Sequence, residues 1–271
     1  MSIGMKAYYS ENPYTVCIGQ NGFPYVDRDT VRNDSVNMSD GNSKVGAVMA
    51  MNFPIEQTCD HKCECYKDGL CYACGGHYAR ANNQSIYAEN LAYFLTHTNA
   101  EWIEEINRQI RIMNRKLFRW FTCGDILNER FLKAMVQIAK ENPSIKFWSY
   151  TKKYKIVNKY VKENGLESIP ENLVIIFSHW KNRDGSYFPM DNPYDFPTSE
   201  FIPIGEEYLT ETVTNICPCS DPNVLETCET CSHPCYELKH GQSMALLEHS
   251  TTDSKERDKT VQKAHKALKA V

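Results

Sequence analysis

The segment KLFRWFTCGD (116–125) decides the fold, because it starts a regular alternation of short apolar runs and helical segments. Two further apolar runs follow, IKFWSYT (145–151) and LVIIFSHW (173–180), and residues 131–140 and 154–163 between them have the spacing of helices. The first of these helices stops at an Asn-Pro pair and the second at an Asn-Gly pair. Strands that alternate with helices in this way are typical of βαβ units. The segment therefore predicts an α/β fold with a largely parallel sheet.

The same alternation extends toward the N-terminus. VGAVMAMNF (45–53) is a short apolar run that predicts a buried strand, and residues 83–98 and 101–115 have helical spacing. In parallel sheets of this kind the ligand site lies at the carboxyl ends of the strands. We therefore expect the ends of successive strands to meet around one site. The candidate ligand-binding residues at these ends are Gly124, Asp125, Thr151 and His179.

Composition and charge limit the classes of function. The chain has 271 residues, of which 42% are hydrophobic and 24% charged, as is ordinary for a soluble globular protein. Its formal net charge of −4 gives no overall basic field for non-specific binding of nucleic acid, so only the lysines near the C-terminus support such contact, and weakly. No apolar run is long enough to span a membrane, and residues 1–14 lack the apolar core of a signal peptide. We expect a cytoplasmic protein without membrane contact, in the host cell if it is encoded by a phage.

Most of the twelve cysteines fall in two groups. The members of the first group are Cys59, Cys63, Cys65, Cys71 and Cys74. The members of the second group are Cys217, Cys219, Cys228, Cys231 and Cys235. Short spacings between cysteines bring several sulfurs to one point, as a metal ion or an iron–sulfur cluster requires. A disulfide framework is the alternative, but an intracellular chain of this size does not need such bridges to build a core.

The first group has the residues of a known cysteine loop. TCDHKCECY (58–66) resembles the loop of the radical S-adenosylmethionine enzymes, which reads C-x3-C-x2-C with an aromatic residue beside the last cysteine. Here Cys59 and Cys63 have the first spacing, whereas Cys65 comes one residue early. The third thiolate is then Cys65 or one of the two later cysteines of the group, or else four thiolates close a structural site. Sets made only of thiolates suit both iron–sulfur clusters and zinc.

This resemblance implies a cofactor and a reaction. In that family three thiolates hold a [4Fe–4S] cluster whose open iron binds S-adenosylmethionine, and an acidic, glycine-rich turn after the next strand receives the amino group of the methionine moiety. Gly124 and Asp125 stand at the matching place, and Cys123 just before them should lie near the cluster. If the chain is an enzyme, the resemblance implies one-electron chemistry, in which the cluster reduces the bound sulfonium and a radical forms. An unidentified substrate would then lie beneath Gly124, Thr151 and His179.

The order of motifs along the chain resembles a second family, the phage gene product 88 proteins. An early cysteine group that contains Cys-Tyr-Ala (71–73) is followed by a strand ending in Gly-Asp, by Phe-Trp-x-Tyr-Thr (147–151) and by a late C-x2-C group. The resemblance covers roughly residues 45–236. It implies a phage or prophage origin and a metal-containing fold, and it implies no particular reaction.

The second cysteine group offers four thiolates from one short segment, and a spare. Cys228, Cys231 and Cys235 follow one another with two and three residues between them, and Cys217 or Cys219 lies upstream. Two alternatives stand for this group. One is a closed structural site, for which zinc fits the spacing, and the other is a second, auxiliary iron–sulfur cluster.

From these observations we predict one α/β domain, an incomplete parallel (β/α) barrel like that of the radical S-adenosylmethionine proteins. Residues 1–43 form an irregular arm, residues 44–210 form the barrel with the first cysteine group and a long loop at 183–203, and residues 211–271 form a cysteine-rich extension with a C-terminal helix. The predicted function is that of a phage-type iron–sulfur protein, with the radical chemistry described above. The alternative is a non-catalytic structural or binding metalloprotein, with zinc or closed iron–sulfur sites, that acts on a host factor or nucleic acid.

Overall fold

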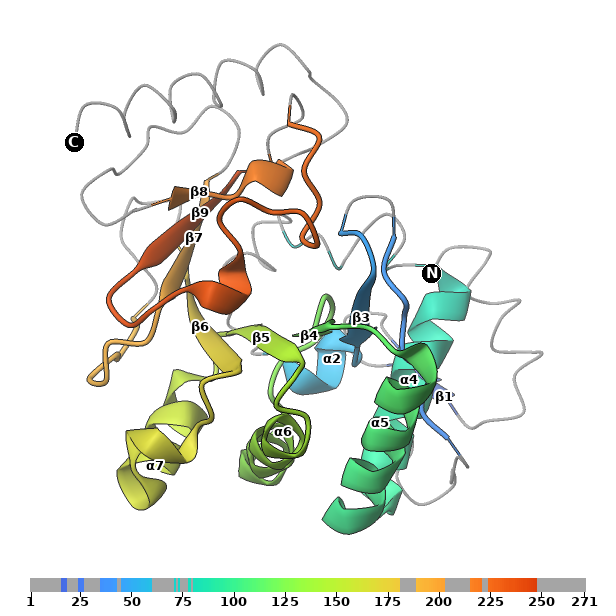
Figure 1. The fold of residues 1–271 in the computed structure, drawn as a ribbon. Helices are drawn as coiled ribbons and strands as arrows, with labels where there is room; N and C mark the ends of the chain where they lie inside the picture. Colours follow the sequence, from blue (N-terminus) through green and yellow to red (C-terminus); the bar gives the residue numbers. More distant parts are fainter. Residues whose placement is uncertain are drawn as a thin grey trace.

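The protein is built on one open sheet with helices packed against it (Figure 1). The structure, a computed structural model, describes residues 16–18, 24–26, 35–42, 45–59, 71, 73, 78, 80–180, 189–202, 215–220 and 224–247. The strands of the sheet follow the order β3-β4-β5-β6-β7-β9-β8, and all neighbours in it are parallel. The prediction of an α/β fold with a parallel sheet is therefore confirmed, and the sheet is open.

The described elements have the following bounds. The strands of the sheet are β3 (Val48–Met51), β4 (Leu117–Trp120), β5 (Lys146–Thr151), β6 (Leu173–His179), β7 (Thr198–Ile202), β8 (Asn215–Ile216) and β9 (Ser243–Leu247). The helices are α2 (Ile55–Thr58), α4 (Ala81–Thr96), α5 (Asn99–Met113), α6 (Glu129–Glu141) and α7 (Tyr154–Asn164). The 3-10 turns are η2 (Leu166–Ser168), η3 (Pro218–Ser220) and η4 (Cys235–Glu237). A separate antiparallel pair consists of β1 (Val16–Ile18) and β2 (Pro24–Val26).

Local signals in the sequence set the helix ends. Helix α5 begins at a capping box, in which the side chain of Thr98 accepts a hydrogen bond from the backbone N–H of Glu101 and the Glu101 carboxylate accepts one from the N–H of Thr98. The side chain of Asn128 caps α6 by accepting from the N–H of Phe131, at 3.0 Å. Helix α7 ends at Gly165, whose φ of 81° an L-residue rarely adopts. The predicted helices at 131–140 and 154–163 are therefore confirmed.

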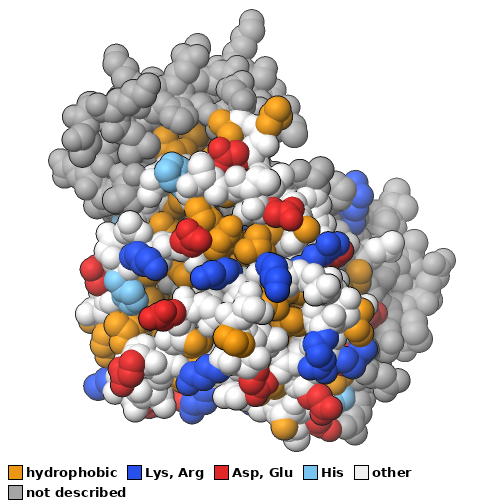
Figure 2. Space-filling model, viewed as in Figure 1, with side chains coloured by type: hydrophobic (Ala, Val, Ile, Leu, Met, Phe, Trp, Pro, Cys, Tyr) orange, Lys and Arg blue, Asp and Glu red, His pale blue; other side chains and the backbone are white. Residues whose placement is uncertain are grey.

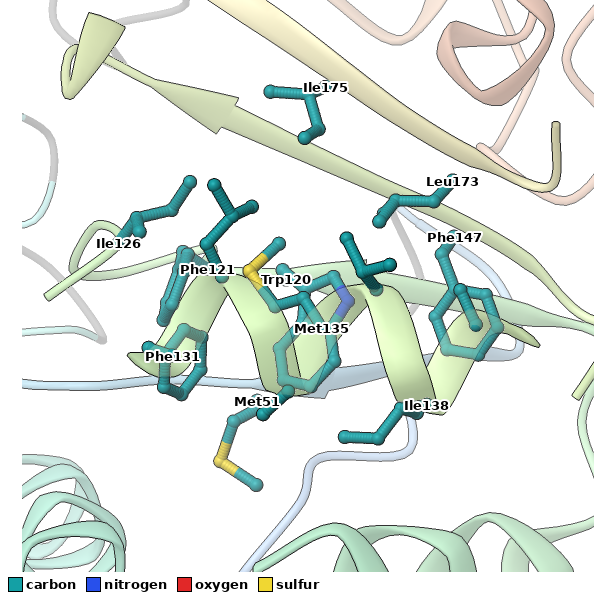
Figure 3. Packing of buried hydrophobic residues seen from close by; sticks show 14 of the residues in the cluster. Met51, Trp120, Phe121, Ile126, Phe131, Met135, Ile138, Phe147, Leu173 and Ile175 are labelled. Carbon is teal, nitrogen blue, oxygen red and sulfur yellow. The ribbon is translucent and has the colours of Figure 1, made fainter. Parts of the chain in front are cut away.

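The first face of the sheet packs against the helices α4 to α7, which lie together on one side of it (Figure 1). Because side chains alternate between the faces of a strand, alternate residues of β3, β4, β5 and β6 contribute to this core. Figure 3 shows Phe131, Met135 and Ile138 of α6 lying against Trp120 of β4. Fully buried aromatic rings in contact with one another fill the end of this core nearest the carboxyl edge of the sheet. These rings are Phe53, Phe94, Trp102, Phe121 and Phe131.

The second face of the sheet carries the intervening residues and is covered by the second cysteine group instead of by helices. Its buried apolar side chains are Val48, Leu117, Trp148, Ile176 and Met244. Cys217, Cys228 and Cys235 pack against them, together with Tyr236 and Leu238. The rings of Trp148 and Tyr236 lie 5.3 Å apart between their centroids. In Figure 1 this orange and red segment lies on the opposite side of the sheet from the helices.

Two parts of the prediction need correction. The sequence predicts a loop at 183–203, but residues 198–202 form β7 inside the sheet. Residues from 211 onward are predicted as an extension beyond the barrel, yet β8 and β9 supply the last two strands of the same sheet. The strands β7, β8 and β9 are short and lack a long apolar run. Their side chains are buried by the neighbouring strands of the sheet. The predicted C-terminal helix lies outside the described residues.

The segment 35–42, part of the predicted arm, is fastened to the helical layer. Ser39 pairs with Ala50 at the free edge of β3. The carboxylate of Glu105 on α5 accepts hydrogen bonds from the Ser35 hydroxyl at 2.8 Å and from the Val36 N–H at 3.3 Å. Burial alone would raise the pKa of Glu105, but hydrogen bonds from Arg108, Gln109, Ser35 and Val36 lower the pKa to about 2. Glu105 therefore stabilises the fold as long as it is ionised.

Replacing Glu105 with Gln should make stability less dependent on pH. The pKa of Glu105 is about 2 in the folded protein, below its ordinary value of 4.5, so its contribution to stability is present above pH 4.5 and is lost as the pH falls toward 2. We expect E105Q to lose up to about 3 kcal/mol of unfolding free energy at neutral pH and much less near pH 3, measured by urea unfolding. Replacing the exposed neighbour Glu104 with Gln is the control, and an equal pH profile for both variants would contradict the assignment.

Candidate functional site

The loop after β4 is held against the end of β3 by one side chain. The Oδ1 atom of Asn52, which is 6% exposed, accepts hydrogen bonds from the N–H of Thr122 (2.8 Å), the hydroxyl of Thr122 (2.7 Å) and the N–H of Cys123 (2.9 Å). The N–H of Phe53 in turn donates to the Cys123 carbonyl at 3.0 Å. These bonds fix Cys123 at the carboxyl edge of the sheet.

Gly124 continues this loop in a conformation that requires glycine. Its φ is +96°, and a Cβ atom there would lie 2.8 Å from the carbonyl oxygen of Phe53. The tight approach brings the N–H of Asp125 to the hydroxyl of Thr58, at the end of α2, over 3.1 Å. The loop after β4 therefore contacts the segment that leads into the first cysteine group.

The carboxylate of Asp125 joins the ends of β4 and β5. It is buried and accepts hydrogen bonds from the Thr151 hydroxyl (2.6 Å), the Lys152 N–H (2.9 Å) and the Ile126 N–H (2.7 Å). Burial raises the pKa of Asp125, and these hydrogen bonds oppose the rise without cancelling it. Gly124, Asp125 and Thr151 thus lie together, as the sequence predicts, with Asp125 and Thr151 bonded to each other. That they bind a cofactor stays a prediction.

Three cysteines from separate segments converge beside this link. Burial raises the pKa of Cys59 well above its ordinary value, and the charges of Asp125, Cys123 and Cys71 raise it further. Burial likewise raises the pKa of Cys123, with a further contribution from Cys71. The apolar surroundings come from Ile55, Ala73 and Tyr87. The sulfurs of Cys59, Cys71 and Cys123 are therefore close enough for their charges to act on one another.

Lys152, which the sequence analysis does not single out, borders the same edge. Its ammonium group donates to the Ser178 hydroxyl at 3.1 Å, lies 5.4 Å from the centre of the Trp180 ring, and lowers the pKa of Cys59. His179 follows Ser178 at the end of β6, where burial lowers the pKa of His179, so the imidazole is neutral at pH 7. Lys152 thus places a positive charge among the acidic groups of this edge, and the charge of Lys153 acts on Asp125 there as well.

The second cysteine group forms a separate set on the second face of the sheet. Hydrogen bonds with the thiols of Cys217, Cys228 and Cys231 raise the pKa of Cys219, and the bond with Cys219 lowers the pKa of Cys217 and of Cys231. The fifth thiol, Cys235, accepts a hydrogen bond from the Tyr150 hydroxyl at 2.8 Å. The structure therefore brings the members of the predicted second group together.

One family model matches more than half of the chain. The family model Gene product 88 matches residues 30–196. The chain belongs to the Gene product 88 family. This membership agrees with the phage origin that the order of motifs implies. No curated protein and no solved structure matches the chain.

The region matched by the Gene product 88 family contains the carboxyl edge but not the second cysteine group. It includes Asn52, Cys59, Cys71 and the segment 123–125, and it ends before β7. The family description names no reaction and no cofactor. The identity of any bound group therefore has to be argued from the residues themselves.

As they stand, the described side chains do not form a finished metal site. No group of three or more His, Cys, Asp or Glu side chains in the described ranges is arranged to hold a metal ion. No disulfide joins the cysteines in that part of the chain either, so the bridged alternative gains no support there. Cys63, Cys65 and Cys74 of the first group lie outside the described residues. The metal ligands therefore stay predictions, and the sulfur contacts above are what supports them.

The predictions about nucleic-acid and membrane contact concern the surface and the helices of the protein. The face in Figure 2 mixes Lys and Arg side chains with Asp and Glu, without a continuous basic patch among its described side chains. The lysine-rich tail, which carries the prediction of nucleic-acid contact, lies outside those residues. None of the helices that the structure describes has the length and apolar character needed to cross a membrane.

Replacing Asn52 with Ala should destabilise the protein by about 2 to 4 kcal/mol, because the N–H groups of Thr122 and Cys123 lose their acceptor in a buried place. Thr122→Val is the matched variant, since it removes only the side-chain bond to Asn52, and we expect a loss of about 1 kcal/mol. Urea unfolding monitored by tryptophan fluorescence measures both. Equal losses in the two variants would show that Asn52 does not hold this loop.

Proposed function

We propose that the chain is a phage-type iron–sulfur protein whose centre lies at the carboxyl edge of the sheet. The observation that carries the proposal is the convergence of Cys59, Cys71 and Cys123 beside the ends of β3 and β4. Cys59 follows α2, Cys71 comes later in the first cysteine group, and Cys123 lies in the loop after β4. Cys63 and the other cysteines of the first group are further thiolates for the same centre.

The donor set fits this kind of group. Soft thiolate ligands in apolar surroundings suit an iron–sulfur cluster, and ligand sites in parallel α/β folds lie at this edge of the sheet. Three thiolates close together repel one another in such surroundings, so they ionise together only when a cation balances them. The ammonium group of Lys152 supplies a single positive charge. A metal centre supplies the remaining positive charge.

The finer proposal is an enzyme like the radical S-adenosylmethionine proteins. A bound [4Fe–4S] cluster with one open iron supplies one electron to a bound sulfonium. The strands β3 to β7 follow the chain in order and the helices lie on one face, which is also the arrangement of a (β/α) barrel. In this proposal Gly124, Thr151 and His179 border the cofactor, and Lys152 beside Trp180 orients an anionic group such as a carboxylate.

A second candidate function is that of a non-catalytic metalloprotein with zinc at the same cysteines, acting on a host factor or nucleic acid. The observation in its favour is the carboxylate of Asp125. The resemblance assigns this group to the amino end of the cofactor, yet it accepts hydrogen bonds from Thr151, Ile126 and Lys152 that hold the strand ends together. A residue used in this way has less capacity left for a ligand.

Iron and sulfide analysis after anaerobic purification tests the centre. We expect about four irons with equivalent sulfide per chain and a visible absorbance from thiolate-bound iron. Cys59→Ser should abolish that absorbance, whereas Cys231→Ser, a matched change in the second group, should leave it intact. Zinc without iron or sulfide in the anaerobically purified protein would contradict the iron–sulfur proposal and favour the zinc alternative.

Reductive cleavage of S-adenosylmethionine tests the enzyme. Under a chemical reductant the intact protein should convert the cofactor to methionine and 5′-deoxyadenosine, with the added electron and an abstracted hydrogen atom completing the balance. Cys59→Ser should produce neither product. Iron-loaded protein that fails to bind or cleave the cofactor would leave the non-catalytic alternative as the better account.

A further inference from the structure

The second cysteine group contains a four-sulfur core centred on Cys219. The thiol of Cys219 hydrogen-bonds with those of Cys217, Cys228 and Cys231, which come from two different turns of the chain. The charge of Cys228 also acts on Cys217, and that of Cys217 on Cys231, so the four sulfurs lie in one group. This set lies apart from the centre proposed above, on the second face of the sheet.

Backbone N–H groups aim two of these sulfurs. The sulfur of Cys217 accepts a hydrogen bond from the N–H of Cys219 within the turn η3, where the N–H of Ser220 donates to the Cys217 carbonyl at 3.0 Å. The sulfur of Cys231 accepts one from the N–H of His233. Hydrogen bonds of this kind favour a thiolate and fix its orientation, as outer-shell donors do around metal ligands. Both turns are therefore shaped to present charged sulfur.

The turn around Cys228 and Cys231 is braced independently of its sulfurs. The carboxylate of Glu226 accepts hydrogen bonds from the N–H and the hydroxyl of Ser232, and the N–H of Thr230 donates to the Thr227 carbonyl at 3.1 Å. Glu229, inside the turn, accepts from the N–H of Ala47 at 3.0 Å, just before β3. The turn is thus docked on the sheet before any metal enters.

Cys235 lies near Cys217 and Cys228 but differs from the four in its hydrogen-bond partner. Its sulfur accepts the Tyr150 hydroxyl at 2.8 Å, and it begins the turn η4 against the second face. The guanidinium group of Arg119 lies 5.0 Å from the centre of the Tyr150 ring and adds a positive charge on that side of the sheet. The sheet already engages Cys235, which makes it the spare thiol of the group.

The closeness of the four sulfurs distinguishes one metal ion from a cluster. Tetrahedral zinc, with zinc–sulfur bonds of about 2.3 Å, holds its four sulfurs roughly 3.8 Å apart, within contact of one another. In a cubane cluster each cysteine binds a different iron, so the cysteine sulfurs are spread around a larger core. The contacts of the Cys219 thiol with three other thiols match the short sulfur–sulfur distances around a single ion.

We infer that Cys217, Cys219, Cys228 and Cys231 bind one Zn²⁺ ion in a closed structural site, and that Cys235 is not a ligand. The described side chains do not have the geometry of a finished metal site. The thiols nevertheless contact one another, and rotation about the first side-chain torsion moves a sulfur toward a metal while the braced backbone stays in place. On binding, the thiols release their protons to solvent, and four thiolates leave no open position on the metal.

The site has a structural consequence. Zinc at the four cysteines joins the turn η3 to the turn at 228–231. The chain that follows the second turn covers the apolar second face of the sheet with Tyr236 of η4 and with Leu238. Because the ion is fully coordinated by protein, it takes no part in a reaction. This inference goes beyond the proposed iron–sulfur function and is independent of it.

The test is metal content and cobalt binding of the full chain. We expect one zinc per chain in the intact protein and in C59S, and its loss in C219S and C228S. C235S and Y150F, matched changes at the spare thiol and its donor, should keep the zinc. Adding Co²⁺ to the metal-free protein should give the thiolate-to-cobalt charge transfer and tetrahedral bands of a four-thiolate site, with equal intensity in C235S, and zinc should displace the colour.

Several outcomes would overturn the inference. Loss of zinc or of cobalt colour in C235S would make Cys235 a ligand, and iron with sulfide remaining in C59S would make the second group a cluster. A disulfide in the second group of the protein purified under reducing conditions would exclude the ion. Because the cobalt titration uses the unmodified chain and C235S, it decides the matter even if C219S fails to fold. Zinc bound by the intact chain without any iron or sulfide would sink only the proposed function.

Discussion

The buried carboxylate of Asp125 is the group on which the carboxyl edge of the sheet depends. It receives the Thr151 hydroxyl and two backbone N–H groups, and so links the end of β4 to the end of β5. The position of Lys152, which donates one of these N–H groups, follows from the link, while Asn52 holds Cys123 two residues earlier. A buried carboxylate without such donors would strongly destabilise the protein, so the edge keeps its shape whether or not a ligand is present.

The two faces of the sheet place the two cysteine groups in different physical settings. At the carboxyl edge Cys59, Cys71 and Cys123 interact through their charges in apolar surroundings, with Lys152 close by. On the second face Cys219 touches three other thiols, and backbone N–H groups point at the sulfurs. The first arrangement suits a larger inorganic core with access to a ligand, and the second suits one enclosed ion. The spacing of cysteines along the sequence does not by itself distinguish these two arrangements.

Much of the fold follows from the sequence between 116 and 180, because its apolar runs are long enough to need burial on both faces of a sheet. The strand β7, TSEFI (198–202), could not be found in that way, since its polar residues Ser199 and Glu200 are buried by neighbouring strands and not by their own character. For the site, the position of Cys123 after a predicted strand was enough to place it near the first group. The bond from Tyr150 to Cys235 spans 85 residues and depends on how the second face is covered, which no local pattern records.

An open parallel sheet has to cover its second face, and this requirement connects the two sites. The helices cover the first face because each βαβ unit returns on the same side. The other face, with Trp148 and Ile176, is buried by residues that follow β8, and these form little regular structure of their own. Most of the described backbone hydrogen bonds of this segment close single turns, so a cross-link between the turns contributes order that those bonds do not supply. In the inferred zinc site, the four clustered cysteines provide that cross-link.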